Sequence, residues 1–219
     1  MTHPTPDPTE TTAASATDLM SVLRDSTRDA HQSAERRPLN RALARGTLTR
    51  PLWIAHLEQL LLLNRALEAR IDQSLPSRTA WTDLIAGRRR VPDLEADLRY
   101  WQGSVAPDPL PATAQAVGRI AAIDDHGALG MLYVLEGSTN GGRFLAKSVA
   151  RGFGLPADSR EGLRSLDPYG EQQPARWASF KTTMNTLPAD PSVISAIQAG
   201  AQTMFEMVGD IADDVWATA

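Results

Sequence analysis

Two groups of residues in this chain have types and spacings that could carry chemistry, and the first is a set of glycines. Gly137, Gly141 and Gly142 interrupt residues 128–150, where leucines recur at three- and four-residue steps, the spacing of a helix. Each interior glycine costs a helix about 1 kcal/mol relative to alanine, so the three cost about 3 kcal/mol together. Because Gly137 and Gly141 are four residues apart, they share a face without side chains, and a flat ligand could lie against its main chain. A helix break at Asn140, or close packing of another helix, would also explain them.

The second group surrounds a histidine in a predicted helix. His31 has Arg24 seven residues before it and Glu35 four residues after it, so the three share one helical face. A carboxylate that accepts a ring N–H fixes the tautomer of a histidine and directs its other nitrogen toward a metal ion. Arg24 would suit a carboxylate at the rim of a ligand. An exposed helix with ordinary pairs of side chains is the alternative, and His56 and His126 remain possible ligands.

The sequence lacks the motifs of several other kinds of functional site. Helical dinuclear carboxylate proteins use Glu-x-x-His pairs, and no glutamate here has a histidine three residues later. The glycine motifs that bind nucleotides and the nucleophile motif of hydrolases are also missing. The chain has no cysteine, which excludes disulfides, thiolate nucleophiles and cysteine-bound metals and fits a reducing compartment.

Composition limits the partners of the chain. Its 219 residues carry a net charge of −4, which gives no basic footprint for nucleic acid or an anionic membrane surface. The only basic run, Arg88 to Arg90, is expected to be a solvated helix end. No apolar span approaches the roughly 20 residues of a membrane crossing, and the start of the chain lacks signal-peptide features. We expect a disordered tail over residues 1–16, one domain over 17–219 and a cytoplasmic protein.

The domain is predicted to be all-α, because start and stop signals for helices follow one another and no alternating strand pattern occurs. The expected helices cover residues 17–36, 39–45, 49–75, 80–86, 92–101, 112–124, 128–150 and 174–187, and a last helix begins at 190. Residues 152–171, rich in glycine, are expected to be irregular.

Several segments together resemble the heme oxygenase family. Thr27 to His31 followed by Glu35 is similar to the proximal helix of that family, and Tyr133 to Gly142 is similar to the distal helix of its bacterial members. Further agreement comes from Tyr169-Gly170 with Trp177 and Phe180, from Met184 to Leu187, and from Phe205 in the final helix. These segments occur in the family's order and span residues 18–215.

The resemblance implies a multihelical heme oxygenase fold in which heme b lies between a proximal helix and a glycine-kinked distal helix. His31 would be the iron ligand and Glu35 its hydrogen-bond partner. Arg24 and Lys181 would pair with the heme propionates.

On the distal side, the resemblance implies that Gly137, Gly141 and Gly142 let the backbone cover the heme. Tyr133 would lie near the heme. Ser138 replaces an aspartate that organises water in many members, although bacterial members with Gly-Ser lack it too. Asn140 stands where a small or apolar residue is expected, and it could contact water or the ligand or cap a helix kink.

The implied reaction is oxidative cleavage of heme to biliverdin, with release of carbon monoxide and ferrous iron. Heme would be both cofactor and substrate, and dioxygen and an electron-donor protein or small reductant would also be required. No nucleic acid or membrane partner is expected. Ser138 and Asn140 leave open a heme carrier or sensor that does not cleave heme, and a structural protein without cofactor is a further alternative. A thiaminase-like enzyme is disfavoured, because such enzymes use a nucleophilic cysteine.

Overall fold

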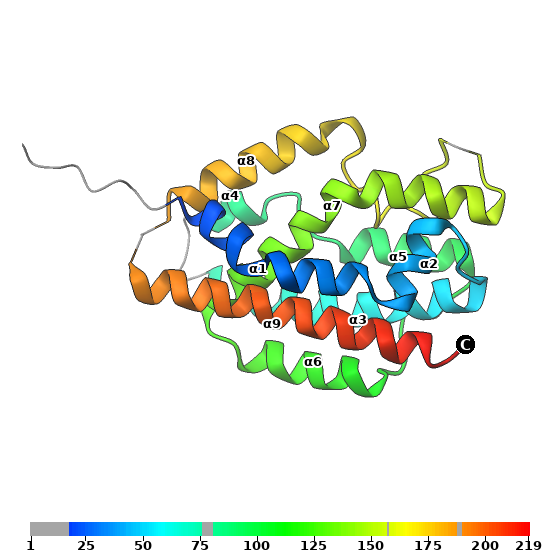
Figure 1. Ribbon diagram of the computed structural model, residues 1–219, viewed down its shortest axis with the longest axis horizontal. Helices are drawn as coiled ribbons and strands as arrows, with labels where there is room; N and C mark the ends of the chain where they lie inside the picture. The colour runs from blue at the N-terminus through cyan, green and yellow to red at the C-terminus, as the bar shows by residue number, and fades with distance from the viewer. Residues whose placement is uncertain (1–17, 76–80, 157, 188–189) are drawn as a thin grey trace, which may run out of the picture.

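The computed structural model describes residues 18–75, 81–156, 158–187 and 190–219, and every regular element in these ranges is helical, as predicted. The tail predicted to be disordered lies outside the described residues. In chain order the elements are α1 (Leu19–Glu35), α2 (Pro38–Arg45), α3 (Arg50–Ser74), α4 (Thr82–Ile85), α5 (Val91–Trp101), α6 (Pro111–Ala122), α7 (Asp125–Phe153), the 3-10 helix η3 (Gly170–Gln172), α8 (Gln173–Asn185) and α9 (Pro191–Trp216) (Figure 1).

Local sequence explains where the helices begin and end. Prolines stand in the first turns of α2, α3, α5, α6, α8 and α9, where a missing N–H has no helical acceptor to lose. The Asp124 carboxylate accepts the backbone N–H of Gly127 at 2.7 Å and starts α7, and Asp190 accepts that of Ser192 at 2.8 Å and starts α9. Gly154 ends α7 with a left-handed backbone, at a φ of +68°.

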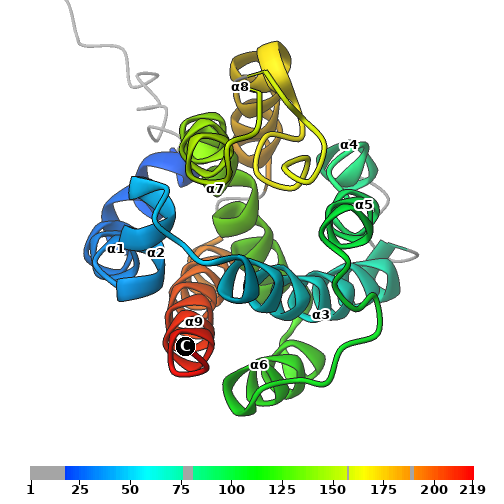
Figure 2. The ribbon, with the colours of Figure 1, turned by 90° about the vertical axis from the view of Figure 1, so that its right-hand side faces the viewer.

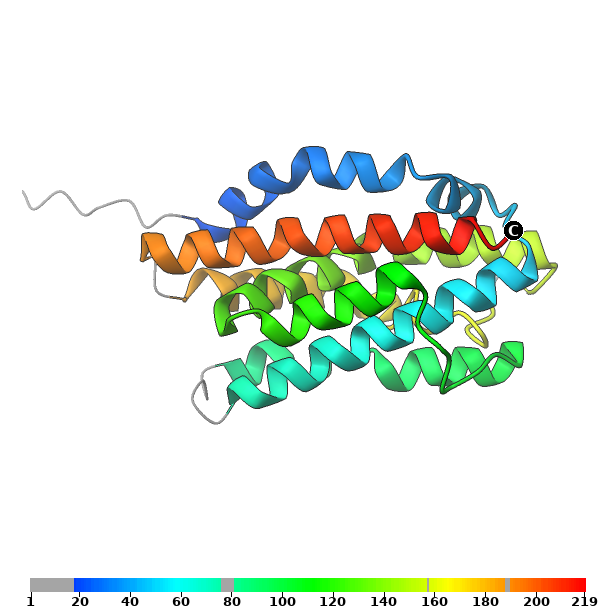
Figure 3. The ribbon, with the colours of Figure 1, turned by 90° about the horizontal axis from the view of Figure 1, so that it is seen from below.

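The long helices α7 and α9 form the centre of the fold. A β-carbon added at Gly130 of α7 would overlap the backbone of Ile197, and one added at Gly200 of α9 would overlap the backbone of Gly127. The two helices therefore cross at closer range than side chains allow. Helix α1 lies along α9, where Gln202 donates a hydrogen bond to the carbonyl of Ser26 at 3.4 Å (Figures 1 and 3).

On the other side of this pair, α3 packs against α5, α6 and α7 (Figure 2). Its fully buried side chains include Trp53, Leu57 and Leu61. The opposite flank of α7 carries α8, whose Asn185 side chain accepts the backbone N–H of Met20 at the start of α1, at 3.1 Å. Helices α1, α7 and α8 are thus neighbours, and they carry all the predicted site residues.

The helix that contains the three glycines is continuous, which excludes one of the explanations considered for them. Helix α7 continues from Asp125 to Phe153, so the break considered at Asn140 does not occur. Among the described residues, no helix combines the length and the apolar character that a membrane crossing needs.

Candidate functional site

His31 lies on the solvent-accessible side of α1. Its side chain is 57% exposed, and its ring packs edge-on against Phe205 of α9, with the ring centroids 5.7 Å apart. The Nδ1 atom lies 3.7 Å from a carboxylate oxygen of Glu35. This separation is longer than a hydrogen bond, so Glu35 stands beside the ring without holding it. The Nε2 atom is the ring nitrogen turned away from this carboxylate.

The other two histidines of the described residues have different surroundings. His56 is buried in α3 near Trp53, its Nδ1 atom has no hydrogen-bond partner, and burial lowers its pKa to about 4. His126 is partly buried and packs edge-on against Trp81, with the ring centroids 5.8 Å apart. Of these histidines, His31 alone combines an exposed ring with a neighbouring carboxylate.

The three glycines of α7 have different environments. A β-carbon added at Gly141 would meet no atom within 4 Å, and one at Gly137 would lie 3.7 Å from the indole ring of Trp177, an ordinary contact. One at Gly142 would overlap the backbone carbonyl of Leu166. Close packing therefore explains Gly142. Gly141 is open and Gly137 is bordered by Trp177, and the two form a strip of main chain on one side of α7. We call this strip the glycine face.

The three polar side chains between the glycines bond to the backbone of their own helix. Ser138, Thr139 and Asn140 each donate a hydrogen bond to the carbonyl three residues earlier, at 2.7, 2.7 and 2.8 Å. Such bonds satisfy the side chain locally and give each carbonyl a second donor. The Asn140 side chain therefore contacts the glycine face itself, through the carbonyl of Gly137.

Two predicted cations lie near the same end of the site. Arg24 of α1 is exposed, and its guanidinium bonds to the carboxylate of Asp25 at 3.2 Å. Lys181 of α8 is also exposed. Each residue is four positions, one helical turn, from the hydrogen bond between Met20 and Asn185 that joins these two helices. The structure thus brings both cations close to one junction, and this junction lies about three helical turns before His31.

Aromatic side chains border the glycine face. The ring centroids of Tyr133 and Trp177 are 6.1 Å apart, and burial raises the pKa of the Tyr133 phenol, while the nearby Thr27 hydroxyl partly offsets this effect. Phe144 is 64% exposed and shares the helical face of Gly137 and Gly141. It was not among the predicted site residues. Its spacing from Gly141, three residues, is the signal that could have identified it.

These features fit a flat ligand with an anionic rim. The glycine face presents main-chain atoms to one surface of such a ligand. A β-carbon at Gly141 would occupy the open space beside this main chain. The exposed imidazole of His31 offers a metal ligand from the neighbouring helix, and Arg24 and Lys181 offer positive charge for carboxylates.

Sequence comparison agrees with this geometry. The family model described as heme oxygenase matches residues 17–214. The chain belongs to the heme oxygenase family. Over 122 residues it is 34% identical to a heme oxygenase of Xanthomonas campestris pv. campestris, a match that covers 54% of this chain and 64% of that protein, slightly less than two thirds of its length.

Known heme oxygenase structures share the fold. The Leptospira interrogans heme oxygenase superimposes with a TM-score of 0.80 and 23% identity, covering 89% of this chain and 98% of that one. Heme oxygenase-2 of Synechocystis sp. PCC 6803, solved in complex with heme and NO, gives a TM-score of 0.83 and 23% identity, covering 92% of this chain and 86% of that one. At these identities the likeness establishes the fold, and the predicted all-α, heme oxygenase-like fold is confirmed.

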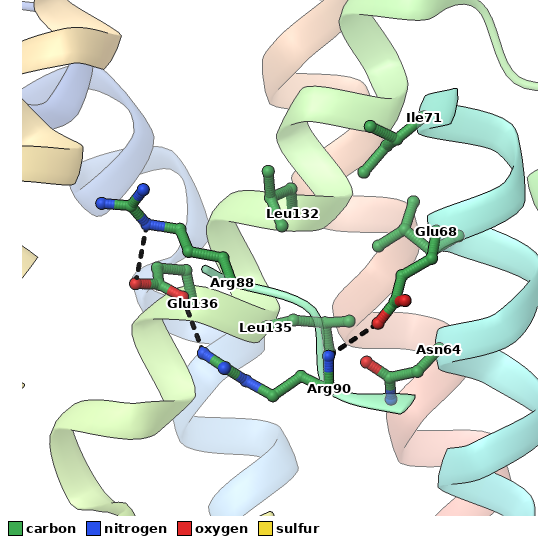
Figure 4. A pocket seen from close by; sticks show the side chains of 9 residues that line it. Asn64, Glu68, Ile71, Arg88, Arg90, Leu132, Leu135 and Glu136 are labelled. Carbon is green, nitrogen blue, oxygen red and sulfur yellow. Dashed lines mark hydrogen bonds and ion pairs between the residues drawn. The ribbon is translucent and has the colours of Figure 1, made fainter. Parts of the chain in front are cut away.

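The structure also holds a buried ion cluster that we did not predict from the sequence. Arg88 and Arg90, expected to be a solvated helix end, are buried, and that prediction is wrong for both. Arg88 bonds to Glu136 of α7 at 3.1 Å and Arg90 bonds to the other carboxylate oxygen at 2.8 Å (Figure 4). The Tyr169 hydroxyl adds a bond to Glu136 at 2.8 Å. A buried carboxylate needs such partners, and they hold the linker before α5 and the segment before η3 against α7.

A small cavity adjoins this cluster. Its volume of about 20 Å³ is sufficient for one water molecule, and Glu68, Asn64, Arg90 and Glu136 supply polar atoms to its wall (Figure 4). None of the predicted site residues lines it. Glu136 immediately precedes Gly137 and is turned from it by about 100° around the helix, so the cluster holds a different side of α7 from the glycine face.

Proposed function

We propose that this protein is a heme oxygenase that cleaves heme to biliverdin and releases carbon monoxide and ferrous iron. The observation that supports the proposal best is that two neighbouring helices carry an exposed imidazole, on α1, and the glycine face, on α7. The heme-bound structures of family members add support, because a shared fold can place the ligand similarly. Dioxygen and electrons from a donor protein or a small reductant complete the reaction.

In this proposal His31 binds the iron through Nε2, the ring nitrogen that does not face Glu35. Phe205, packed edge-on against the ring, limits the orientations of the imidazole. Glu35 approaches Nδ1, and a rotation that shortens the 3.7 Å separation to a hydrogen bond would fix the tautomer and raise the basicity of the ligand.

The remaining residues orient the substrate. When bound, heme supplies both the iron that activates dioxygen and the porphyrin ring that is oxidised. Arg24 and Lys181 pair with its propionates and fix its rotation in the plane of the ring, which decides the carbon presented for cleavage. Gly137 and Gly141 allow the ring and a small ligand to approach the main chain, while Tyr133 limits the access of water.

Hemin titration followed by aerobic reduction tests the proposal. Addition of hemin to the purified protein should produce the Soret band of a histidine-bound heme. Addition of a reductant system in air should then remove this band while the absorption of biliverdin grows. A stable Soret band under these conditions would indicate a heme carrier, and no spectral change with hemin would refute heme binding altogether.

The role of His31 has its own test. His31→Ala should lose the histidine-bound spectrum, and free imidazole should restore it, because the imidazole can occupy the space of the missing ring. His126→Ala is the matched control and should keep the wild-type spectrum. If His31→Ala binds hemin with an unchanged spectrum, the iron ligand is another residue.

A further inference from the structure

A single glutamine joins α8 to the glycine-containing part of α7. Gln173 is buried at the start of α8, and its side-chain nitrogen donates to the Thr139 hydroxyl and to the side-chain oxygen of Asn140, both at 3.0 Å. Its amide has two hydrogens, so it can satisfy both acceptors at once.

This contact fixes the orientation of the Asn140 amide. Because the Gln173 nitrogen can only donate, the oxygen of Asn140 must face it, and the Asn140 nitrogen must face the other way. There it donates one hydrogen to the carbonyl of Gly137 at 2.8 Å. The Thr139 hydroxyl is oriented by the same logic, since it accepts from Gln173 and donates to the carbonyl of Glu136 at 2.7 Å.

One N–H group of Asn140 remains available. Within the described part of the chain it has no acceptor, and the side chain is exposed. On a helix, Asn140 lies about 60° from Gly137 and about 40° from Phe144, at the edge of the glycine face. The hydroxyl hydrogens of Ser138 and Thr139 are both used on backbone carbonyls. Among these three consecutive polar side chains, Asn140 alone keeps a donor for a ligand.

We propose that Asn140 donates a hydrogen bond to a small ligand bound over the glycine face, and that Gln173 is the positioning residue that keeps its amide turned for this purpose. The inference rests on the proposed function, because the small ligand would bind to the iron of the heme. It gives Asn140 a polar role in a segment that carries no histidine, arginine or carboxylic acid between Gly137 and Gly142.

Azide binding to the ferric hemin complex tests the proposal, since azide accepts hydrogen bonds. Asn140→Leu removes the donor and should weaken azide binding about fivefold, the equivalent of one hydrogen bond of about 1 kcal/mol. Gln173→Glu should weaken it similarly, because the introduced carboxylate accepts the Asn140 N–H group and reverses the amide. Gln172→Glu places the same charge one residue away on an exposed position and should leave the azide affinity within twofold of wild type.

A double variant separates positioning from a general effect. If Gln173 acts through Asn140, then Asn140→Leu combined with Gln173→Glu should bind azide as weakly as Asn140→Leu alone. Additive losses would overturn the positioning role, and wild-type azide affinity in Asn140→Leu would overturn the donor role.

The protein without hemin gives a second measurement. Gln173→Glu should speed amide hydrogen exchange over residues 137–142 relative to Gln172→Glu, because the reversed Asn140 amide no longer donates to the carbonyl of Gly137. Equal exchange in the two variants would contradict the positioning role even if hemin binding were lost. If the wild-type protein itself shows no Soret band with hemin, the proposed function fails, whereas hemin binding with unchanged azide affinities removes only this inference.

Discussion

Alanine substitutions at two adjacent glycines of α7 should change the stability of the protein in opposite directions. At Gly141 the added methyl group meets no atom within 4 Å, so the substitution removes the helix penalty of glycine without a clash. That penalty is about 1 kcal/mol in the interior of a helix. For a protein of 219 residues, a free energy of unfolding larger by 1 kcal/mol raises Tm by about 2–4 °C.

At Gly142 the same methyl group overlaps the carbonyl oxygen of Leu166, a backbone atom that cannot rotate away. Forcing extra atoms into a packed contact costs about 1–3 kcal/mol, which outweighs the gain in helix propensity or at least cancels it. We expect Gly142→Ala to lower the free energy of unfolding by about 1 kcal/mol and Tm by a few degrees.

Substitutions at Gly141 should also change the affinity for hemin. Gly141→Ala should weaken hemin binding about tenfold although the protein without hemin becomes more stable, because the methyl group keeps the ligand from the main chain. Gly141→Leu should abolish binding. Denaturant unfolding of the protein without hemin and Soret titration of each variant measure both effects.

Two outcomes would refute this reasoning. A lower Tm for Gly141→Ala would mean that the strip is packed in solution. A higher Tm with unchanged hemin affinity would mean that the open glycine is not reserved for a ligand, and the heme would have to lie elsewhere.

Three further predictions concern charge. Arg90→Met should lower the free energy of unfolding by about 3 kcal/mol, because it removes a partner from the buried Glu136 carboxylate. Arg143→Met removes a partner from an exposed ion pair and should leave the free energy of unfolding almost unchanged, and denaturant unfolding measures both variants. His56 is neutral in the fold, and it binds a proton more readily in the unfolded chain. As the pH falls from 7 to below 4, the free energy of unfolding should therefore decrease by about 3 kcal/mol more for wild type than for His56→Gln, as measured by denaturant unfolding at each pH. Lys181→Gln should weaken hemin binding up to about fivefold at low salt and less at high salt, with Tm unchanged in thermal unfolding.

The helical architecture could be predicted from sequence because its signals are local. A proline in the first turn, an aspartate such as Asp190 at the cap and a glycine such as Gly46 at the end act within a few residues. The helices accordingly begin and end close to the predicted positions. The largest difference is α7, which begins at Asp125 and ends at Phe153, because the cap at Asp124 and the left-handed Gly154 lie beyond the leucine pattern used to predict it.

The buried ion cluster could not be predicted, because it depends on partners distant in sequence. Three consecutive arginines resemble a solvated run in any local pattern. Glu136 gave the only indication, since a carboxylate among the apolar residues of a buried helix requires a cation. Nothing local shows that this cation comes from the linker before α5, or that Tyr169 joins the pair.

The same limit applies to the glycines of α7. The sequence gives the energetic cost of each glycine to the helix, which is equal at Gly141 and Gly142. It does not show why a glycine is needed at each position. The segment that returns across α7 places Leu166 against Gly142, and nothing in the described part of the chain covers Gly141. Packing therefore accounts for one glycine and leaves the other as an uncompensated cost of about 1 kcal/mol. A ligand bound against the main chain would supply the missing compensation, which is why Gly141 carries more weight for heme binding than its neighbour.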